Sequence, residues 1–279
     1  MSKRKSTPIS TIICVSDLHC GCRMGLCPKH GVELDGGSRY EPSYFQHQLC
    51  GLWEEFWDDW MPRVTEGKPW ALVVNGDVVD GVHHSSTTQI SHNLTDQARI
   101  ATELLRPVVA QAAEYYHIRG TEAHVGQSGA EEERIAEALG AIPDAEGRHA
   151  RWELWYELAG PDGEPRRVHF THHIGTSGSS AGEATALAKE LTEMYVEAGR
   201  WGGPVADVQV RSHRHRYAQV QLMGERGLQI CTVTPAWQGK TPFVYRIAGG
   251  RLSTPQFGGI AVKVGDDGLY TRAKVWTLT

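Results

Sequence analysis

The feature that most constrains this chain is an Asp-x-His motif placed directly after a short apolar run. Residues 11–15, Thr-Ile-Ile-Cys-Val, are typical of a buried strand, and Asp17 and His19 follow at once. Open α/β sheets place their ligands at the carboxyl ends of the strands, so we expect both side chains at a ligand site. Asp-x-His alone is common in surface turns, and the interpretation depends on what recurs downstream.

Three further strand-like runs end in the same residue types. The runs at 70–74, 167–171 and 205–210 lead into Asn75-Gly76-Asp77-Val78-Val79-Asp80, His172-His173 and Ser212-His213-Arg214-His215. Each piece has a simple structural explanation by itself, such as a strand cap or a buried histidine pair. Together, strand ends that carry Asp and His predict one metal site, and imidazoles with carboxylates suit Mn, Fe, Zn or Co.

The order of the predicted elements indicates the fold class. A capping box at Ser43 and Gln46 begins a helix to about residue 65, whose aromatic residues we assign to the core. Helices and strands alternate in the first half of the chain, whereas predicted hairpins dominate the second half. We therefore expect an α/β fold: a four-layer αββα sandwich of two facing mixed sheets flanked by helices. We expect one domain over residues 1–279, with residues 1–8 flexible.

Composition and charge narrow the function classes. The chain has 279 residues and a net charge of −5, without an apolar run of membrane-spanning length. The basic N-terminus is not followed by a signal-peptide apolar stretch, so we expect a cytoplasmic protein without a membrane partner. The negative net charge disfavours binding of nucleic acid over the whole surface of the protein. A local basic groove is still compatible with Arg211, Arg214 and Arg216, which interleave with the histidines.

The cysteines offer a second, weaker hypothesis. Cys20, Cys22 and Cys27 cluster with His30 in a Gly-rich loop, and these four residues could hold a structural zinc. Their spacing matches no common zinc module, and the alternative is a loop of reduced thiols, as expected of a cytosolic protein.

The order of the motifs resembles the calcineurin-like metallophosphoesterases, which carry D-x-H, G-D-x-x-D, G-N-H-[DE], a lone His and G-H-x-H. The matching segments here span Asp17 to His215: Asp17-Leu18-His19, Gly76-Asp77-Val78-Val79-Asp80, Gly120-Thr121-Glu122-Ala123-His124, His172 and Ser212-His213-Arg214-His215. The residues of the later motifs, together with Thr-Pro-Ala-Trp-Gln at 234–238, resemble those of phage- or prophage-encoded members of the family.

The resemblance implies a dinuclear metal centre, with manganese favoured. The implied ligands of one ion are Asp17, His19, Asp77 and His215; Asp77 would bridge to a second ion that His172 and His213 also bind. Two such ions clamp a phosphoryl group and lower the pKa of a bridging water, which then attacks phosphorus as hydroxide. Asp80 would orient the catalytic imidazole, and His173 is the alternative to His172.

The third motif departs from the family pattern. Thr121 stands where a metal-binding Asn is expected, and two extra residues precede His124. Glu122 could replace the Asn as a ligand, which leaves His124 as the general acid for the leaving oxygen. Alternatively, His124 is itself a ligand. Ser212 in place of Gly is a smaller departure that affects the turn geometry.

We expect a phosphodiesterase that acts on nucleic acid or nucleotides. His83, His84 and Arg214 are candidate substrate contacts, with a solvated loop as the alternative for the two histidines. A phosphomonoesterase acting on a small or protein substrate is a close alternative. A catalytically weak metal-binding scaffold that docks a partner is the contrasting class, which loss of the Asn favours and retention of the paired histidines disfavours.

Overall fold

The computed structural model describes residues 8–83, 85–175, 180–224, 227–247 and 252–278. Of the segment expected to be flexible, residues 1–7 lie outside the described residues, as does the candidate substrate contact His84.

The first sheet carries the N-terminal strand at its centre. Its strands lie in the order β13 (Gly268–Trp276), β12 (Phe257–Gly265), β1 (Thr11–Val15), β4 (Ala71–Asn75), β5 (Glu114–Ile118) and β6 (Ala150–Arg151). The four strands from β1 to β6 are parallel, whereas β12 and β13 form an antiparallel hairpin beside β1. Both β1 and β4 are buried along their whole length, because layers cover both faces of this sheet.

The second sheet is also mixed. Its order is β10 (Ala218–Gly224), β11 (Gly227–Val233), β9 (Val208–Arg211), β8 (Pro165–Phe170) and β7 (Leu154–Ala159). The central strands β11, β9 and β8 are parallel, and each edge strand pairs antiparallel through a hairpin. A separate two-stranded ribbon joins β2 (Val32–Glu33) to β3 (Arg39–Tyr40).

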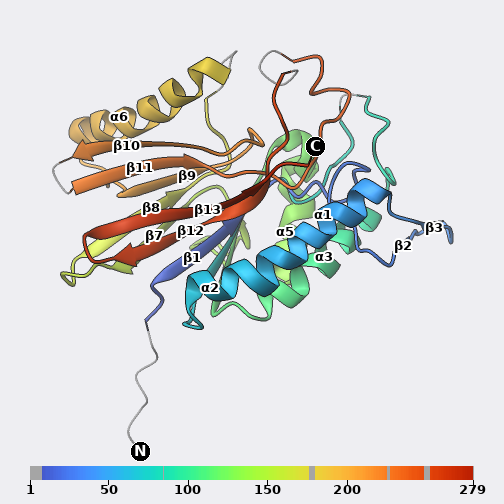
Figure 1. Cartoon of the computed structure of the whole chain (residues 1–279), viewed down its shortest axis with the longest axis horizontal. Helices are drawn as coiled ribbons and strands as arrows, with labels where there is room; N and C mark the ends of the chain where they lie inside the picture. Colours follow the sequence, from blue (N-terminus) through green and yellow to red (C-terminus); the bar gives the residue numbers. More distant parts are fainter. Residues whose placement is uncertain (1–7, 84, 176–179, 225–226, 248–251, 279) are drawn as a thin grey trace, which may run out of the picture.

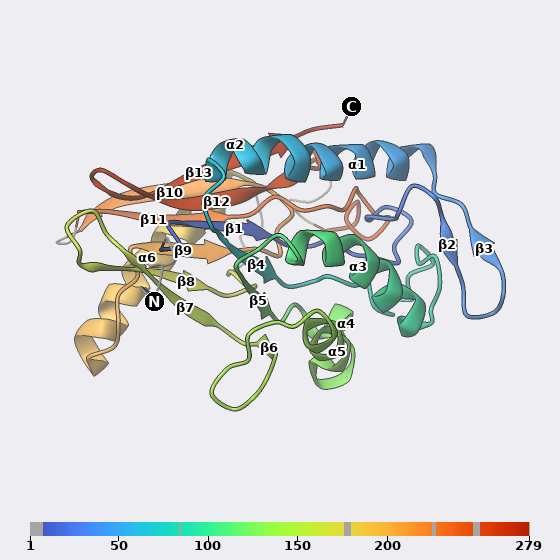
Figure 2. The same ribbon diagram turned by 90° about the horizontal axis from the view of Figure 1, so that it is seen from below.

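The two sheets face each other between two layers of helices (Figures 1 and 2). Apolar residues of both sheets share one core, in which Ile12 and Val73 of the first sheet pack with Val168 and Val210 of the second. The outer face of the first sheet packs on α1 (Tyr44–Glu55), α2 (Met61–Thr65), α3 (Leu94–Val109) and α5 (Ala130–Ala138). The second sheet packs on α6 (Glu183–Trp201). This is the predicted αββα sandwich of two facing mixed sheets flanked by helices.

Local expectations agree with the structure in most places. The capping box of Ser43 and Gln46 begins α1, and a π-helical turn over Phe56–Trp60 joins α1 to α2. Of the aromatic residues in this segment, Trp53, Phe56, Trp57 and Trp60 are buried as predicted, Phe45 is partly buried against the same core, and Tyr44 is exposed. The next helix, α3, ends at Val109, and β5 begins at Glu114, where its backbone pairs with β4. In the described part of the chain, no helix is long and apolar enough to cross a membrane.

Candidate metal centre

Three parallel strands of the first sheet end at the site. Asp17 and His19 follow β1, and Asp77 and Asp80 follow β4. After β5 the chain reaches Thr121, the N-cap residue of the short helix α4 (Glu122–Val125), which contains His124. The backbones of the first two loops pair, because Asp17 N–H donates to the carbonyl of Gly76 at 2.9 Å.

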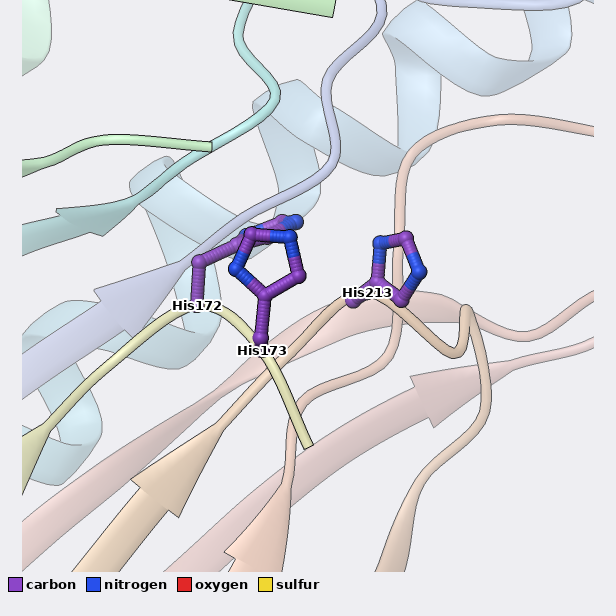
Figure 3. Close-up of side chains that lie close together, drawn as sticks. All are labelled: His172, His173 and His213. Carbon is purple, nitrogen blue, oxygen red and sulfur yellow. The ribbon is translucent and has the colours of Figure 1, made fainter. Parts of the chain in front are cut away.

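Parallel strands of the second sheet end at the same place. His172 and His173 follow β8, and His213 and His215 follow β9. Figure 3 shows that the rings of His172, His173 and His213 gather between these two loops. The site therefore lies at the carboxyl ends of strands from both sheets, where the sequence predicted it.

The backbone at the site is unusual. Asp17, His19, Asp77, His213 and His215 all have left-handed φ values, of 53°, 45°, 54°, 71° and 56°. Residues other than glycine rarely adopt this conformation, and such strained positions cluster at functional sites.

Close packing of two loops explains both glycines of the matched motifs. A Cβ on Gly76 would lie 2.6 Å from Nδ1 of His172, and a Cβ on Gly120 would lie 2.1 Å from Oδ1 of Asp77. Neither position accepts a side chain unless His172, Asp77 or the neighbouring backbone moves.

The deepest part of the site joins two carboxylates to one imidazole. Nε2 of His172 lies 3.0 Å from Oδ2 of Asp77 and 3.9 Å from Oδ1 of Asp17. Nδ1 of His172 donates to the carbonyl of Asn75 at 2.6 Å. A neutral His172 would therefore turn an Nε2 lone pair toward the carboxylates. Burial lowers the pKa of His172, but the charges of Asp77 and Asp17 outweigh it and raise that pKa to about 10. Either a proton or a cation is needed at this nitrogen.

A second group lies on the other side of Asp17. Nε2 of His215 lies 3.3 Å from Oδ1 of Asp17 and 3.1 Å from Nε2 of His19. Nδ1 of His19 faces Oδ1 of Asp80 at 3.3 Å. A carboxylate on one ring nitrogen, with the other nitrogen turned to the site, is typical of metal-binding histidines.

The structure corrects the expected role of the Asp80 carboxylate. We expected it to orient His124, but it faces His19. Its oxygens also accept hydrogen bonds from Gln89 at 2.8 Å and Gln238 at 3.0 Å, and these amides hold the carboxylate in its position beside His19. His124 instead donates from Nδ1 to the backbone carbonyl of Asp80 at 2.6 Å.

His124 lies inside the site. Its ring packs edge-on against that of His19, with centroids 4.6 Å apart, and its ligand atoms come close to those of His19 and Asp77. Burial is the main cause that lowers the pKa of His124 to about 4, and the charge of Asp77 opposes it. The imidazole is therefore neutral near pH 7, with the proton on Nδ1.

Thr121, and not Glu122, is directed into the site, which corrects a second expectation. The Thr121 hydroxyl lies 3.2 Å from Oδ2 of Asp77 and 3.0 Å from Nδ1 of His213. Glu122 is exposed and belongs to none of the described clusters that could bind a metal. The reason is local, because Thr121 occupies the N-cap position of α4 without a side-chain capping bond, and the first turn of that helix carries the next side chain outward.

The zinc hypothesis for the cysteine loop is also corrected. Cys20, Cys22 and Cys27 are buried free thiols, whereas His30 is exposed and pairs with Glu103 at 2.9 Å. Among the described residues, these four do not form a group with ligand atoms within metal-binding distance of one another. The histidine points away because its partner is a carboxylate on α3. The alternative of reduced, packed thiols agrees with the structure.

A cavity of about 540 Å³ opens over the centre, and its lining includes His83, His124 and Arg214. Nε2 of His83 lies 3.7 Å from Oδ2 of Asp80, so this predicted substrate contact faces the site. The Arg214 guanidinium donates to the carbonyl of Gly175, and Arg216 pairs with Glu183 of α6.

A chain of hydroxyl groups supports Asp17, and the sequence interpretation missed it. Ser16 donates to Oδ2 of Asp17 at 2.6 Å and lies 2.6 Å from the Thr234 hydroxyl, which lies 2.8 Å from that of Ser212. Asn75 donates to the Ser212 hydroxyl at 2.7 Å. The family pattern has a Gly in place of Ser212, so that substitution was the available signal. The other hydroxyls gave none.

The buried carboxylate of Glu132 is a second element that the sequence did not reveal. It accepts a hydrogen bond from the backbone N–H of Val78 at 3.0 Å and another from that of Gly120 at 2.7 Å. These two amides lie next to Asp77 and Thr121. Glu132 therefore ties together the loops after β4 and β5.

Orphaned polar atoms show that the site fits a cation. Oδ1 of Asp17 is buried and lacks a hydrogen-bond partner, although two imidazole nitrogens face it. Burial raises the pKa of Asp17, but His215 and His172 outweigh it and hold that pKa below its usual value, so the oxygen is an anion. The Asp and His clusters could therefore bind metal ions.

The comparisons with known proteins add little. No family model matches the chain, and no curated protein matches in sequence. Similar solved structures include vacuolar protein sorting 29 from Cryptosporidium parvum, with TM-score 0.37 and 10% identity over 98% of this chain and 100% of the other. A Thermotoga maritima protein has TM-score 0.37 and 11% identity over 97% and 100%. A hypothetical Pyrococcus horikoshii protein has TM-score 0.41 and 9% identity over 94% and 87%.

Proposed function

We propose that the chain is a metal-dependent hydrolase of phosphate esters, and that it belongs to the calcineurin-like metallophosphoesterases as a phage-type member. The observation that carries this proposal is the buried, unpartnered Oδ1 of Asp17, which two imidazole nitrogens face. The order of the motifs supports the family assignment.

We propose that these donors bind two divalent ions, with manganese favoured. Asp17, His19 and His215 form one group of possible ligands. The second ion would take Asp77 with His172 and His213, and His173 is a further candidate because it clusters with both histidines. When bound, the ions would neutralise phosphoryl charge and lower the pKa of a coordinated water.

The residues around the ions have separate tasks. Asp80 holds the tautomer of His19, and the carbonyl of Asn75 does the same for His172. Thr121 supplies a hydroxyl at the position of the family Asn and donates to Asp77. We assign His124 as the proton donor to the leaving oxygen. Its neutral state in the metal-free protein means that it must first take up a proton, and a ligand role is the alternative.

The proposed substrate is a phosphodiester, either nucleic acid or a nucleotide. Arg214 and Lys240 line the cavity beside the donor groups and would counter the charge of the ester. The cavity is also large enough for an organic group as well as a phosphate, since small-molecule sites usually measure about 300–1,000 Å³.

The test compares hydrolysis of bis-p-nitrophenyl phosphate and p-nitrophenyl phosphate with Mn²⁺ and after chelation. We expect metal-dependent turnover with the diester preferred, and loss of that turnover in Asp17→Asn. Asp58→Asn is the matched control, since Asp58 is an exposed carboxylate on the π-helical turn. Preference for the monoester would favour the phosphomonoesterase alternative.

A metal-binding scaffold that docks a partner is the second candidate. The presence of Thr121 at the position of the family Asn favours it, because a hydroxyl is a weaker ligand than an amide oxygen. Stoichiometric metal binding without hydrolysis of either ester would support the scaffold and contradict the proposed enzyme.

A further inference from the structure

One wall of the cavity is apolar and takes no part in the proposed chemistry. It comes from the connection between β11 and β12 and consists of Phe243, Val244 and Ile247. We propose that this wall binds a flat aromatic group, a nucleobase or an aryl ring, carried by the phosphate ester next to the reacting phosphorus. This inference rests on the proposed function and names the substrate class.

The wall is built onto the metal centre. Just before it, the N–H of Trp237 donates to the carbonyl of Asp17 at 2.9 Å, and Gln238 donates to Oδ1 of Asp80 at 3.0 Å. The N–H of Gly239 donates to the carbonyl of Met24 at 2.8 Å, and a Cβ at Gly239 would lie 2.7 Å from the Phe45 ring. These contacts fix the start of the β11–β12 connection next to Asp17 and Asp80.

The chemistry of the wall differs from that of the floor. Imidazoles and carboxylates form the floor, whereas Phe243 and Ile247 are large apolar side chains that are 41% and 39% exposed. Exposed apolar area costs free energy in water that a bound apolar group recovers.

Two further features select an aromatic, anionic ligand. Phe243 brings an aromatic ring to the cavity lining, and aromatic rings bind other flat rings through stacking geometry. Lys240 lines the same cavity, with its ammonium 4.9 Å from the centroid of the Tyr245 ring. A cation beside an apolar face matches an ester that joins a phosphate directly to a nucleoside or an aryl group.

The experiment compares two diesters with the same leaving group, methyl p-nitrophenyl phosphate and thymidine 5′-(p-nitrophenyl phosphate), on the Mn²⁺-loaded protein. Since nitrophenolate leaves from both, the ratio of their kcat/KM values reports only the retained group. We expect the thymidine ester to be favoured by roughly ten-fold or more, and Phe243→Ala to remove most of that preference, as losing one base–aromatic stacking contact does.

Three controls make the result specific. Phe243→Leu keeps an apolar wall without a flat face, and we expect it to lose the preference as well. Trp201→Ala removes an aromatic side chain that is 79% exposed on α6, and it should keep the wild-type ratio. Octyl p-nitrophenyl phosphate tests for an aliphatic occupant. Thermal unfolding verifies that each variant is folded.

The outcomes separate the two proposals. A wild-type ratio near one, or a ratio that Phe243→Ala leaves unchanged, overturns this inference while the hydrolase assignment stands. If the octyl ester is preferred as strongly as the thymidine ester and Phe243→Leu keeps full activity, the group bound at the wall is an alkyl chain and not an aromatic ring. If the loaded protein hydrolyses none of the esters, the proposed function is wrong and this inference fails with it.

Discussion

Nε2 of His172 lies 3.0 Å from Oδ2 of Asp77, and both side chains are shielded from water. The other nitrogen of the ring donates to the carbonyl of Asn75, the last residue of the strand that leads into Asp77. One strand end therefore fixes both the carboxylate and the imidazole that comes from the opposite sheet. This contact sets the distance between the two halves of the site.

Removal of the Asp77 charge should abolish metal binding and activity together. Asp77 faces His172 and His213 of the second sheet, and its ligand atoms also lie close to those of His19 of the first sheet, so Asp77→Asn weakens both groups of donors. We expect about two ions per chain in wild type after reconstitution with Mn²⁺, and a stoichiometry well below that in the variant. Elemental analysis of gel-filtered protein measures this. Retention of full stoichiometry by Asp77→Asn would contradict its shared role.

Substitution of His124 should affect esters with poor leaving groups selectively. General acid catalysis typically contributes about a hundred- to ten-thousand-fold. His124→Ala should lose about this factor on an alkyl diester, and much less on a nitrophenyl ester, because nitrophenolate leaves without a proton. The measurement is kcat/KM on both esters together with metal content.

The neighbouring residue gives the control for that experiment. Glu122→Ala should keep the metal stoichiometry, because the side chain is exposed and lies outside the clusters. If His124→Ala instead loses one metal equivalent and slows both esters equally, His124 is a ligand.

Glu132 should position the two loops that carry Asp77 and Thr121. Glu132→Gln replaces one acceptor oxygen with an amide NH2 group, which cannot accept a hydrogen bond, so the N–H of Val78 or Gly120 stays unpaired. We expect a loss of about 1–3 kcal/mol in unfolding free energy and a Mn²⁺ affinity weaker by about 10- to 100-fold. Glu137→Gln on the exposed face of α5 is the matched control. Unchanged Mn²⁺ affinity in a destabilised Glu132→Gln would leave only a structural role.

His169 should make stability depend on pH in the acidic range. Burial and the positive charge of Arg211 lower the pKa of His169 to about 4. In the unfolded chain the same imidazole has a pKa near 6.5. Neutral His169 therefore contributes fully to the stability of the folded protein above pH 6.5, and this contribution is lost as the pH falls toward 4.

The corresponding measurement is urea unfolding of wild type and His169→Gln between pH 7 and pH 4. The slope of unfolding free energy against pH should be smaller in the variant, by on the order of 2 kcal/mol over this window. Parallel slopes would show that other groups carry the pH dependence. The buried carboxylates at the site contribute mainly below this range, because their pKa values lie below the usual value.

The sequence by itself determined the fold class and where the site lies. Apolar β-branched runs mark the buried parallel strands, and a motif at the end of such a strand must emerge at one edge of its sheet. For this reason Asp17, His19, Asp77, His172 and His215 could be assigned to one centre before any contact was known. These inferences depend on local pattern and on the direction of the chain, which the residue order contains.

Only the tertiary structure decided which side chains complete the centre. The turn of α4 directs Thr121 inward and Glu122 outward, and the Asp80 carboxylate faces His19 because amides from two other segments hold it there. Ser16 and Thr234 touch across 218 positions of sequence. Such contacts depend on how two sheets stack and on left-handed backbone turns, and neither leaves a periodic signal in the residue order.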